Sequence, residues 1–283
     1  PEGQGLHDSS DAACGLFHMP ETYRRVSSTL QLAGTELLAR CASYLKSRRT
    51  HAILACFLAS SVLLVAFSGI DIRISSMFFD HGFYMASQGW ATLLHASVRG
   101  FIVFSMVSVA GIYVFNHLSK RNLFAIDGRK IAYLVLVLIL GAGLIVNVAL
   151  KDNFGRARPR DIAEFGGTEQ FTPAFVISDA CDQNCSFSSG DSAGAFFARA
   201  FMLVARRNRG ISTAGVGFGV LVSAARVASG AHFFSDTVVS FFVMLIVADF
   251  LKHHMLQPEP EPIGSMPAPE PVLLIAAAGK SLS

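Results

Sequence analysis

Three clusters of polar side chains lie between long apolar stretches in the middle of the chain. They occupy residues 151–159, 186–191 and 226–236, and each carries charged or hydroxyl groups in close succession. Charged groups beside segments apolar enough to enter a bilayer are costly there, so they indicate a functional site by default. Because arginine and lysine occur with a histidine and carboxylates, the ligand that fits these clusters best is a phosphate.

Five residues of these clusters are predicted to bind the phosphate. Arginine offers a planar fork that matches phosphate oxygens, and lysine offers a point charge. A glycine at the start of a helix lets a backbone amide approach an anion closely. The predicted phosphate-binding residues are Lys151, Arg158, Ser189, Gly190 and Arg226. Contact with lipid headgroups would explain any one of the basic residues, but it would not explain the spacing of all of them.

A histidine and an aspartate in the third cluster are predicted to perform the chemistry. His232 and Asp236 lie four residues apart, near the start of an apolar segment. A carboxylate that holds one ring nitrogen leaves the other free to act as a nucleophile or base. A single histidine beside a membrane is usually an interfacial side chain, but the spacing of Arg226, His232 and Asp236 favours catalysis.

The clusters resemble the type 2 phosphatidic acid phosphatase family, whose fold is that of the vanadium haloperoxidases. In that family a lysine stands seven residues before an Arg-Pro pair. A Ser-Arg pair is followed six residues later by a histidine and four residues after that by an aspartate. The residues that match these two parts are Lys151, Arg158, Pro159, Arg226, His232 and Asp236. The resemblance implies that His232 attacks phosphorus to form a phosphohistidine, that Asp236 orients it, and that no metal or other cofactor is needed.

The remaining part of the family pattern, Pro-Ser-Gly-His, is only half kept. Ser189 and Gly190 stand in place, whereas Ser188 replaces the proline and Asp191 replaces the histidine. Ala225 also replaces the serine of the Ser-Arg pair. The departure at position 191 matters most, because the family's histidine there protonates the leaving oxygen.

Two hypotheses follow for Asp191. An aspartate is ordinarily ionised at neutral pH and then has no proton to give. Burial and a bound phosphate would favour its protonated form, whereas Lys151, Arg158 and Arg226 would favour the carboxylate. Either Asp191 is a working general acid, or it stays charged and the protein is a slow enzyme or a lipid-phosphate-binding protein.

Composition indicates a polytopic membrane protein. Hydrophobic residues make up 52% of the chain and charged residues only 15%, and the apolar residues come in long blocks. We expect an all-α bundle of six transmembrane helices with the haloperoxidase-like fold. The predicted helices cover residues 51–70, 100–118, 131–150, 192–205, 211–228 and 237–254. The net charge of +3 is small and the basic residues fall in short clusters, so nucleic-acid binding has no support.

The distribution of lysine and arginine predicts the orientation. Basic residues at 46–49, 119–130, 206–210 and 252 all lie on one side if six helices alternate. By the positive-inside rule that side is cytoplasmic. Both termini are then cytoplasmic, and the three polar clusters face the periplasm from a bacterial inner membrane.

The chain divides into three parts. Residues 51–254 form the phosphatase domain, and residues 255–283 form a proline-rich cytoplasmic tail that we expect to be disordered. Residues 1–50 form a cytoplasmic segment with an amphipathic helix, which lies either on the membrane surface or against the protein itself. The apolar face of that helix consists of Val26, Leu30, Ala33, Leu37, Cys41 and Tyr44.

Other residues have structural interpretations. Cys181 and Cys185 lie just before the second cluster, and in an oxidising periplasm they favour a disulfide over free thiols. Two cysteines without a nearby histidine pair make a poor zinc site. Gly215 and Gly219 form part of a small-residue face that allows close helix packing. No metal site is predicted.

The expected function is hydrolysis of a lipid phosphate monoester. The loop at 165–187 is similar to that of bacterial relatives that dephosphorylate lipid A, which favours its 1- or 4'-phosphate as the target. The partners are then a phosphorylated lipid and the bilayer. Phospholipids and undecaprenyl pyrophosphate remain alternative substrates, and transfer of the phosphate to another lipid remains an alternative reaction. A catalytically impaired lipid-phosphate-binding protein is the alternative from another class.

Overall fold

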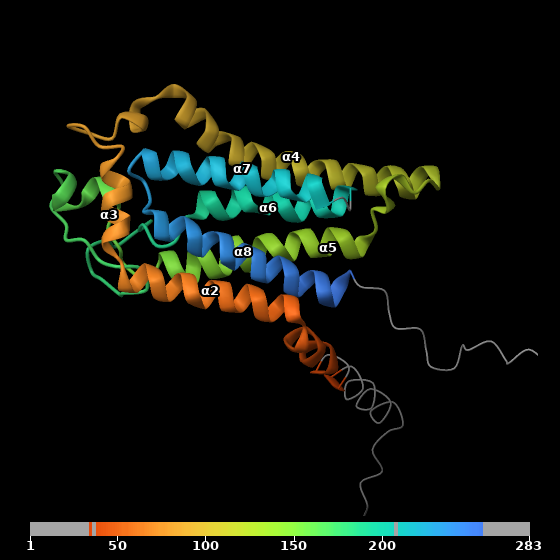
Figure 1. The fold of residues 1–283 in the computed structure, drawn as a ribbon. Coiled ribbons are helices and arrows are strands. Elements are labelled where there is room, and N and C mark those ends of the chain that lie inside the picture. The colour runs from red at the N-terminus through yellow and green to blue at the C-terminus, as the bar shows by residue number, and fades with distance from the viewer. Residues whose placement is uncertain (1–33, 36–37, 207–208, 257–283) are drawn as a thin grey trace, which may run out of the picture.

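The computed structural model describes residues 34–35, 38–206 and 209–256 of the chain, and in that part the architecture is all-α (Figure 1). The long helices are α2 (Arg48–Ala66), α4 (Gly89–Ser119), α5 (Gly128–Leu136) with its π-helical continuation η3 (Val137–Lys151), α6 (Gly190–Arg206), α7 (Arg209–Ala228) and α8 (Phe234–Met255). The short ones are α3 (Gly69–Ser76), η1 (Tyr84–Ser87), η2 (Leu123–Ala125), η4 (Pro159–Asp161) and η5 (Ala163–Phe165). Each predicted apolar segment is helical, so the fold class is confirmed.

Several of the long helices could cross a bilayer. In the described part of the chain four have both the length and the apolar composition for it: Arg48–Ala66, Gly89–Ser119, Gly128–Lys151 and Phe234–Met255. The apolar helix Ser212–Ala228 is shorter. The chain is therefore a multi-pass membrane protein, and the count of six spans stays a prediction.

Helix α4 differs most from its prediction. It begins at Gly89, eleven residues before the predicted start at 100, and runs for 31 residues. Polar residues such as His95 and Arg99 make the first turns too polar to belong to an apolar stretch, but they do not break the helix. The extra turns carry His95 to the end of the bundle where the polar clusters lie.

Helices α6 and α7 pack closely through the small-residue face. A Cβ atom on Gly215 would come within 2.6 Å of the Arg199 backbone nitrogen. One on Gly219 would come within 2.1 Å of the Phe196 ring. Since no side chain fits at either position, the predicted role of this face is confirmed.

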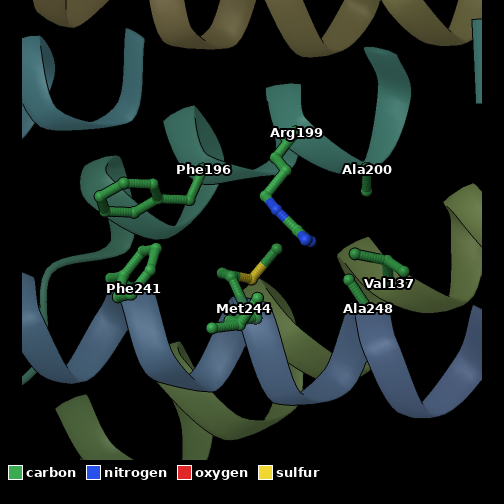
Figure 2. Close-up of a pocket in the computed structure, with 8 residues that line it drawn as sticks. Val137, Phe196, Arg199, Ala200, Phe241, Met244 and Ala248 are labelled. Atoms are coloured by element: carbon green, nitrogen blue, oxygen red, sulfur yellow. The ribbon is translucent and has the colours of Figure 1, made fainter. Parts of the chain in front are cut away.

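The space between η3, α6 and α8 is tightly filled. Figure 2 shows Arg199 extending from α6 toward Val137, Met244 and Ala248, beside a cavity of only about 10 Å³. That space holds at most about one water molecule, so it is no ligand site. Asp249 pairs with Arg49 at 2.7 Å.

The described end of the N-terminal segment contacts α8. The Tyr44 ring lies 5.4 Å from that of Phe250, and the Ser43 hydroxyl lies 3.0 Å from Nε2 of His253. This contact corresponds to the alternative in which the segment packs on the protein itself. Cys41 of the same predicted face lies 3.5 Å from Nε2 of His254. Its remaining residues, Val26, Leu30, Ala33 and Leu37, lie outside the described residues, as does the tail from 257 onward.

The start of α2 and the end of α8 lie at one end of the bundle, and α3 lies with the loops around residues 152–189 at the opposite end (Figure 1). An aromatic cluster at this second end includes Phe83 and Phe165, whose ring centroids are 5.3 Å apart. Phe83 also covers the turn before α8. A Cβ atom on Gly230, whose φ is +65°, would lie 2.3 Å from its ring, so both the turn and the packing require glycine.

Candidate functional site

A cavity of about 520 Å³ opens at the end of the bundle that holds the polar clusters. Residues from all three clusters meet in its wall, although they are separated by up to 81 positions along the chain. The predicted site residues that line it are Lys151, Arg158, Gly190, Asp191, Arg226 and His232. Ser189 and Asp236 are fully buried behind this wall.

His232 lies in the turn between α7 and α8, with only 1% of its surface exposed. Its Nδ1 atom is 2.8 Å from the carbonyl oxygen of Ser186. Because a carbonyl only accepts hydrogen bonds, Nδ1 carries the hydrogen and Nε2 keeps its lone pair in the neutral ring. Burial lowers the pKa of His232 below its ordinary value, so the neutral ring is favoured.

Asp236 lies beside His232 but accepts no hydrogen bond from its ring. Its Oδ2 atom lies 3.7 Å from His232 Nδ1, beyond hydrogen-bond distance. Oδ2 instead accepts hydrogen bonds from the Ser186 hydroxyl at 2.6 Å and from the Phe233 backbone amide at 2.8 Å. Asp236 thus binds both Ser186, whose carbonyl contacts the His232 ring, and Phe233, the residue after His232.

A buried arginine that the sequence reasoning missed completes this support. Arg156 donates to Asp236 at 2.5 Å, to Asp71 at 2.9 Å and to the Ser235 hydroxyl at 2.8 Å. Its Nε atom donates to the Thr172 carbonyl at 2.7 Å. The guanidinium thus joins α3, the long loop and α8 in one ionic network with little access to water.

Asp71 also binds α8 directly. It accepts hydrogen bonds from the Ser235 backbone amide at 2.9 Å and from the Ser235 hydroxyl at 2.5 Å. Burial raises the pKa of Asp71, and Arg156 opposes that rise. Arg156 lies inside the first cluster but outside the family pattern, and no sequence spacing links Asp71 to any cluster.

Basic side chains surround the cavity. Arg158 donates to the Asn184 carbonyl from Nη2 at 2.6 Å and from Nε at 3.3 Å, and burial lowers its pKa. Lys151 ends η3, and the exposed Arg99 and half-exposed Arg160 also line the cavity. This excess of positive charge suits a dianionic phosphate.

The start of α6 contributes backbone groups as well as the Asp191 side chain to the cavity wall. The Ser189 hydroxyl accepts hydrogen bonds from the Ser192 hydroxyl at 2.9 Å and from the Ser192 amide at 3.3 Å, so it caps the helix. A Cβ atom on Gly190 would come within 2.7 Å of Asn147 Oδ1. Glycine therefore lets η3 and α6 approach each other, and it leaves the N-terminus of α6 open to the cavity.

Asp191 lies between two nitrogen-bearing side chains. Its Oδ2 atom is 3.1 Å from Nε of Arg226, and its Oδ1 atom is 3.1 Å from Nδ1 of His95. His95 belongs to α4 and lines the same cavity as His232. Nothing in the sequence marked it, because it lies outside the three clusters.

The loop before the second cluster carries a disulfide between Cys181 and Cys185. The bridge closes the short turn that contains Asn184, the residue whose carbonyl binds Arg158. The disulfide thus helps to fix the carbonyl group that binds Arg158 in the cavity wall. Among the described residues, no group of three or more His, Cys, Asp or Glu side chains could hold a metal ion.

Comparisons with known proteins agree with this geometry. The family model of the PAP2 superfamily matches residues 132–258, which include all three clusters. The chain is similar to a lipid A 4'-phosphatase of Francisella tularensis subsp. novicida (strain U112), with 36% identity over 204 residues, 67% of this chain and 89% of that protein. It is also similar to lipid A 4'-phosphatases of Rhizobium leguminosarum (33% identity) and Rhizobium etli (32%), each over 121 residues, 42% of this chain and 52% and 47% of those proteins. No solved structure matches the chain significantly. The fold, the converging clusters and these similarities together show that the chain belongs to the PAP2 superfamily.

Proposed function

We propose that this membrane lipid phosphatase hydrolyses the 4'-phosphate of lipid A at the periplasmic face of the inner membrane, through a phosphohistidine on His232. The observation that carries the proposal is the meeting of His232 with Lys151, Arg158 and Arg226 in one cavity. The similarity to lipid A 4'-phosphatases supports the choice of substrate.

The geometry supports His232 as the nucleophile. With its Nδ1 hydrogen held by the Ser186 carbonyl, Nε2 is the atom with a lone pair available for phosphorus. Attack places a positive charge on the ring, and the carboxylate of Asp236, 3.7 Å from Nδ1, stabilises that charge. The two arginines and Lys151 bind the phosphoryl oxygens and offset the charge that develops on them.

The position of the cavity supports a lipid substrate. It lies at the bundle end away from the Arg49–Asp249 pair, and the positive-inside rule then assigns it to the periplasmic face. An apolar cavity of about 450 Å³ lies between α3, α7 and α8, with Val227 next to Arg226 in its wall. Acyl chains suit such a space, and the phosphate of a headgroup then reaches the cations.

The test is turnover of purified lipid A that carries both phosphates. The detergent-solubilised protein should remove one phosphate by mass spectrometry, and fragmentation should assign the loss to the 4' position. The His232→Ala variant should release none, whereas His117→Ala, a change at the far end of α4, should act like the native protein. An unchanged lipid A mass with the native protein, or full activity without His232, would count against the proposal.

A lipid-phosphate-binding protein without turnover remains the second candidate, because Asp191 occupies one side of Arg226. Such a protein would retain labelled lipid A in a filter-binding assay and would release no inorganic phosphate. Release of phosphate by the native chain rejects it.

A further inference from the structure

We propose that His95 is the general acid of this enzyme and that Asp191 positions it. The inference rests on the proposed phosphatase function, and it assigns the proton that the leaving oxygen needs. His95 touches the reacting atoms in this scheme, whereas Asp191 acts through it.

The first observation is the location of His95. It comes from the first turns of α4, far in sequence from the three clusters, and its imidazole lines the cavity that contains His232 and Arg226. Its side chain is 32% exposed, so it reaches the space where a substrate binds. A histidine facing a phosphate is suited to donate a proton as well as a hydrogen bond.

The second observation is the contact between His95 and Asp191. The 3.1 Å separation of His95 Nδ1 and Asp191 Oδ1 leaves Nε2 as the ring nitrogen that can face the substrate. A carboxylate beside one ring nitrogen orients an imidazole and stabilises the imidazolium. The pair at positions 95 and 191 therefore has the parts of a His–Asp acid.

The third observation concerns Asp191 itself. Its Oδ2 atom faces Nε of Arg226, which always carries a hydrogen, and its Oδ1 atom faces His95. Both oxygens thus lie in ion-pair contact with neighbouring nitrogen atoms, although neither contact has the alignment of a hydrogen bond. This arrangement fits a carboxylate that positions its neighbours better than a carboxylic acid that protonates substrate.

The reaction balances with these groups. In the first step Nε2 of His232 forms a bond to phosphorus, the phosphorus–oxygen bond of the ester breaks, and the Nε2 hydrogen of the His95 imidazolium moves to the leaving oxygen. In the second step water attacks the phosphohistidine, gives a proton to Nε2 of His95, and releases inorganic phosphate. His232 and His95 then return to their starting states.

The leaving group decides the test. A sugar or alkyl oxygen needs a proton as it leaves, whereas p-nitrophenolate is a weak base and leaves without one. We therefore compare native protein, His95→Ala, His95→Gln and Asp191→Asn on bisphosphorylated lipid A and on p-nitrophenyl phosphate. His117→Ala is the matched control, because it removes a histidine from the same helix outside the site.

The expected result is a selective loss. His95→Ala and His95→Gln should lower kcat on lipid A by about 10²- to 10⁴-fold, and they should lower it on p-nitrophenyl phosphate by less than about tenfold. Asp191→Asn should show the same selectivity. The double variant His95→Ala/Asp191→Asn should have nearly the same kcat on lipid A as His95→Ala alone, because both changes disable the same proton donor, His95.

Equal losses on the two substrates would overturn the inference, because they would indicate a role in binding or folding. Undiminished turnover of lipid A without His95 would overturn it as well. If the native protein ignores lipid A but hydrolyses phosphatidic acid, the proposed substrate is wrong, and the same comparison with phosphatidic acid still tests His95. If the native protein hydrolyses no phosphate ester, both proposals fail.

Discussion

Removal of Arg156 should destabilise the protein far more than removal of the nearby Arg160. Arg156 is 1% exposed and bonds two carboxylates, Asp71 and Asp236, which are themselves 1% and 0% exposed. Arg156→Ala leaves both charges buried without their cation. Breaking a buried pair in this way costs about 3–5 kcal/mol.

Arg160 provides the matched control. It lies four residues along the same loop, and its contact with Asp161 spans 3.8 Å between side chains that are about half exposed. Exposed pairs contribute about 0–1 kcal/mol, so Arg160→Ala should change stability little. In thermal unfolding of the detergent-solubilised protein, Arg156→Ala should lower Tm by on the order of 10 °C, and Arg160→Ala by a few degrees at most.

Coupling within the network can be measured as well. The double variant Arg156→Met/Asp71→Asn removes the cation and one of its anions together. Its loss of unfolding free energy should therefore be smaller, by about 1–3 kcal/mol, than the sum of the losses in the two single variants. Equal melting of Arg156→Ala and Arg160→Ala, or strict additivity of Arg156→Met and Asp71→Asn, would refute the idea that this network supports the site.

Three further predictions concern acidity, topology and redox state. Because burial lowers the pKa of His232, its ring should stay unprotonated as the pH falls through the ordinary pKa of histidine. The value of kcat/KM should therefore stay constant across that pH and decline only at lower pH. A decline centred on the ordinary pKa of histidine would contradict this prediction. Reporter fusions after residues 125 and 170 should lie on opposite sides of the membrane, and the same side for both would rule out six alternating spans. Reduction of the Cys181–Cys185 bridge, or its replacement by two serines, should release the Asn184 carbonyl from Arg158 and so raise KM for lipid A several-fold. Cys56→Ser is the control and should leave KM unchanged. An unchanged KM after loss of the bridge would show that the bridge has no role in phosphate binding.

The parts of the fold that could be predicted are those encoded over short sequence distances. Runs of apolar residues specified the helices, because a bilayer requires about 20 such residues for each span. Gly215 and Gly219 specified a close helix contact for the same local reason, since a repeat of four places them on one helix face. The alternation of apolar segments and polar clusters also predicted that Lys151, Arg158 and His232 lie on one side of the membrane, and the three residues line one cavity.

The parts that could not be predicted depend on which helices pack together. Ser235 and Asp71 are 164 positions apart, and His95 and Asp191 are 96 apart, so no local pattern connects either pair. The spacing of His232 and Asp236 agrees with their contact, because His232 Nδ1 and Asp236 Oδ2 lie 3.7 Å apart. It does not reveal that Arg156 and Ser186 also bind the Asp236 carboxylate.

The buried ionic network explains how an irregular segment can carry a precise site. Between η3 and α6 the chain runs from 152 to 189 with only two short helical turns, and such a segment is ordinarily mobile. Arg156 anchors its start to α3 and α8, and Ser186 anchors its end to Asp236. Ser186 also contacts the His232 ring through its carbonyl. The end of the segment and the tautomer of His232 are therefore both held by a residue that binds the Asp236 carboxylate. Catalytic groups act without reorganisation only when such support holds them in place, so under the proposed mechanism we expect Asp236 to contribute to catalysis from behind the cavity wall.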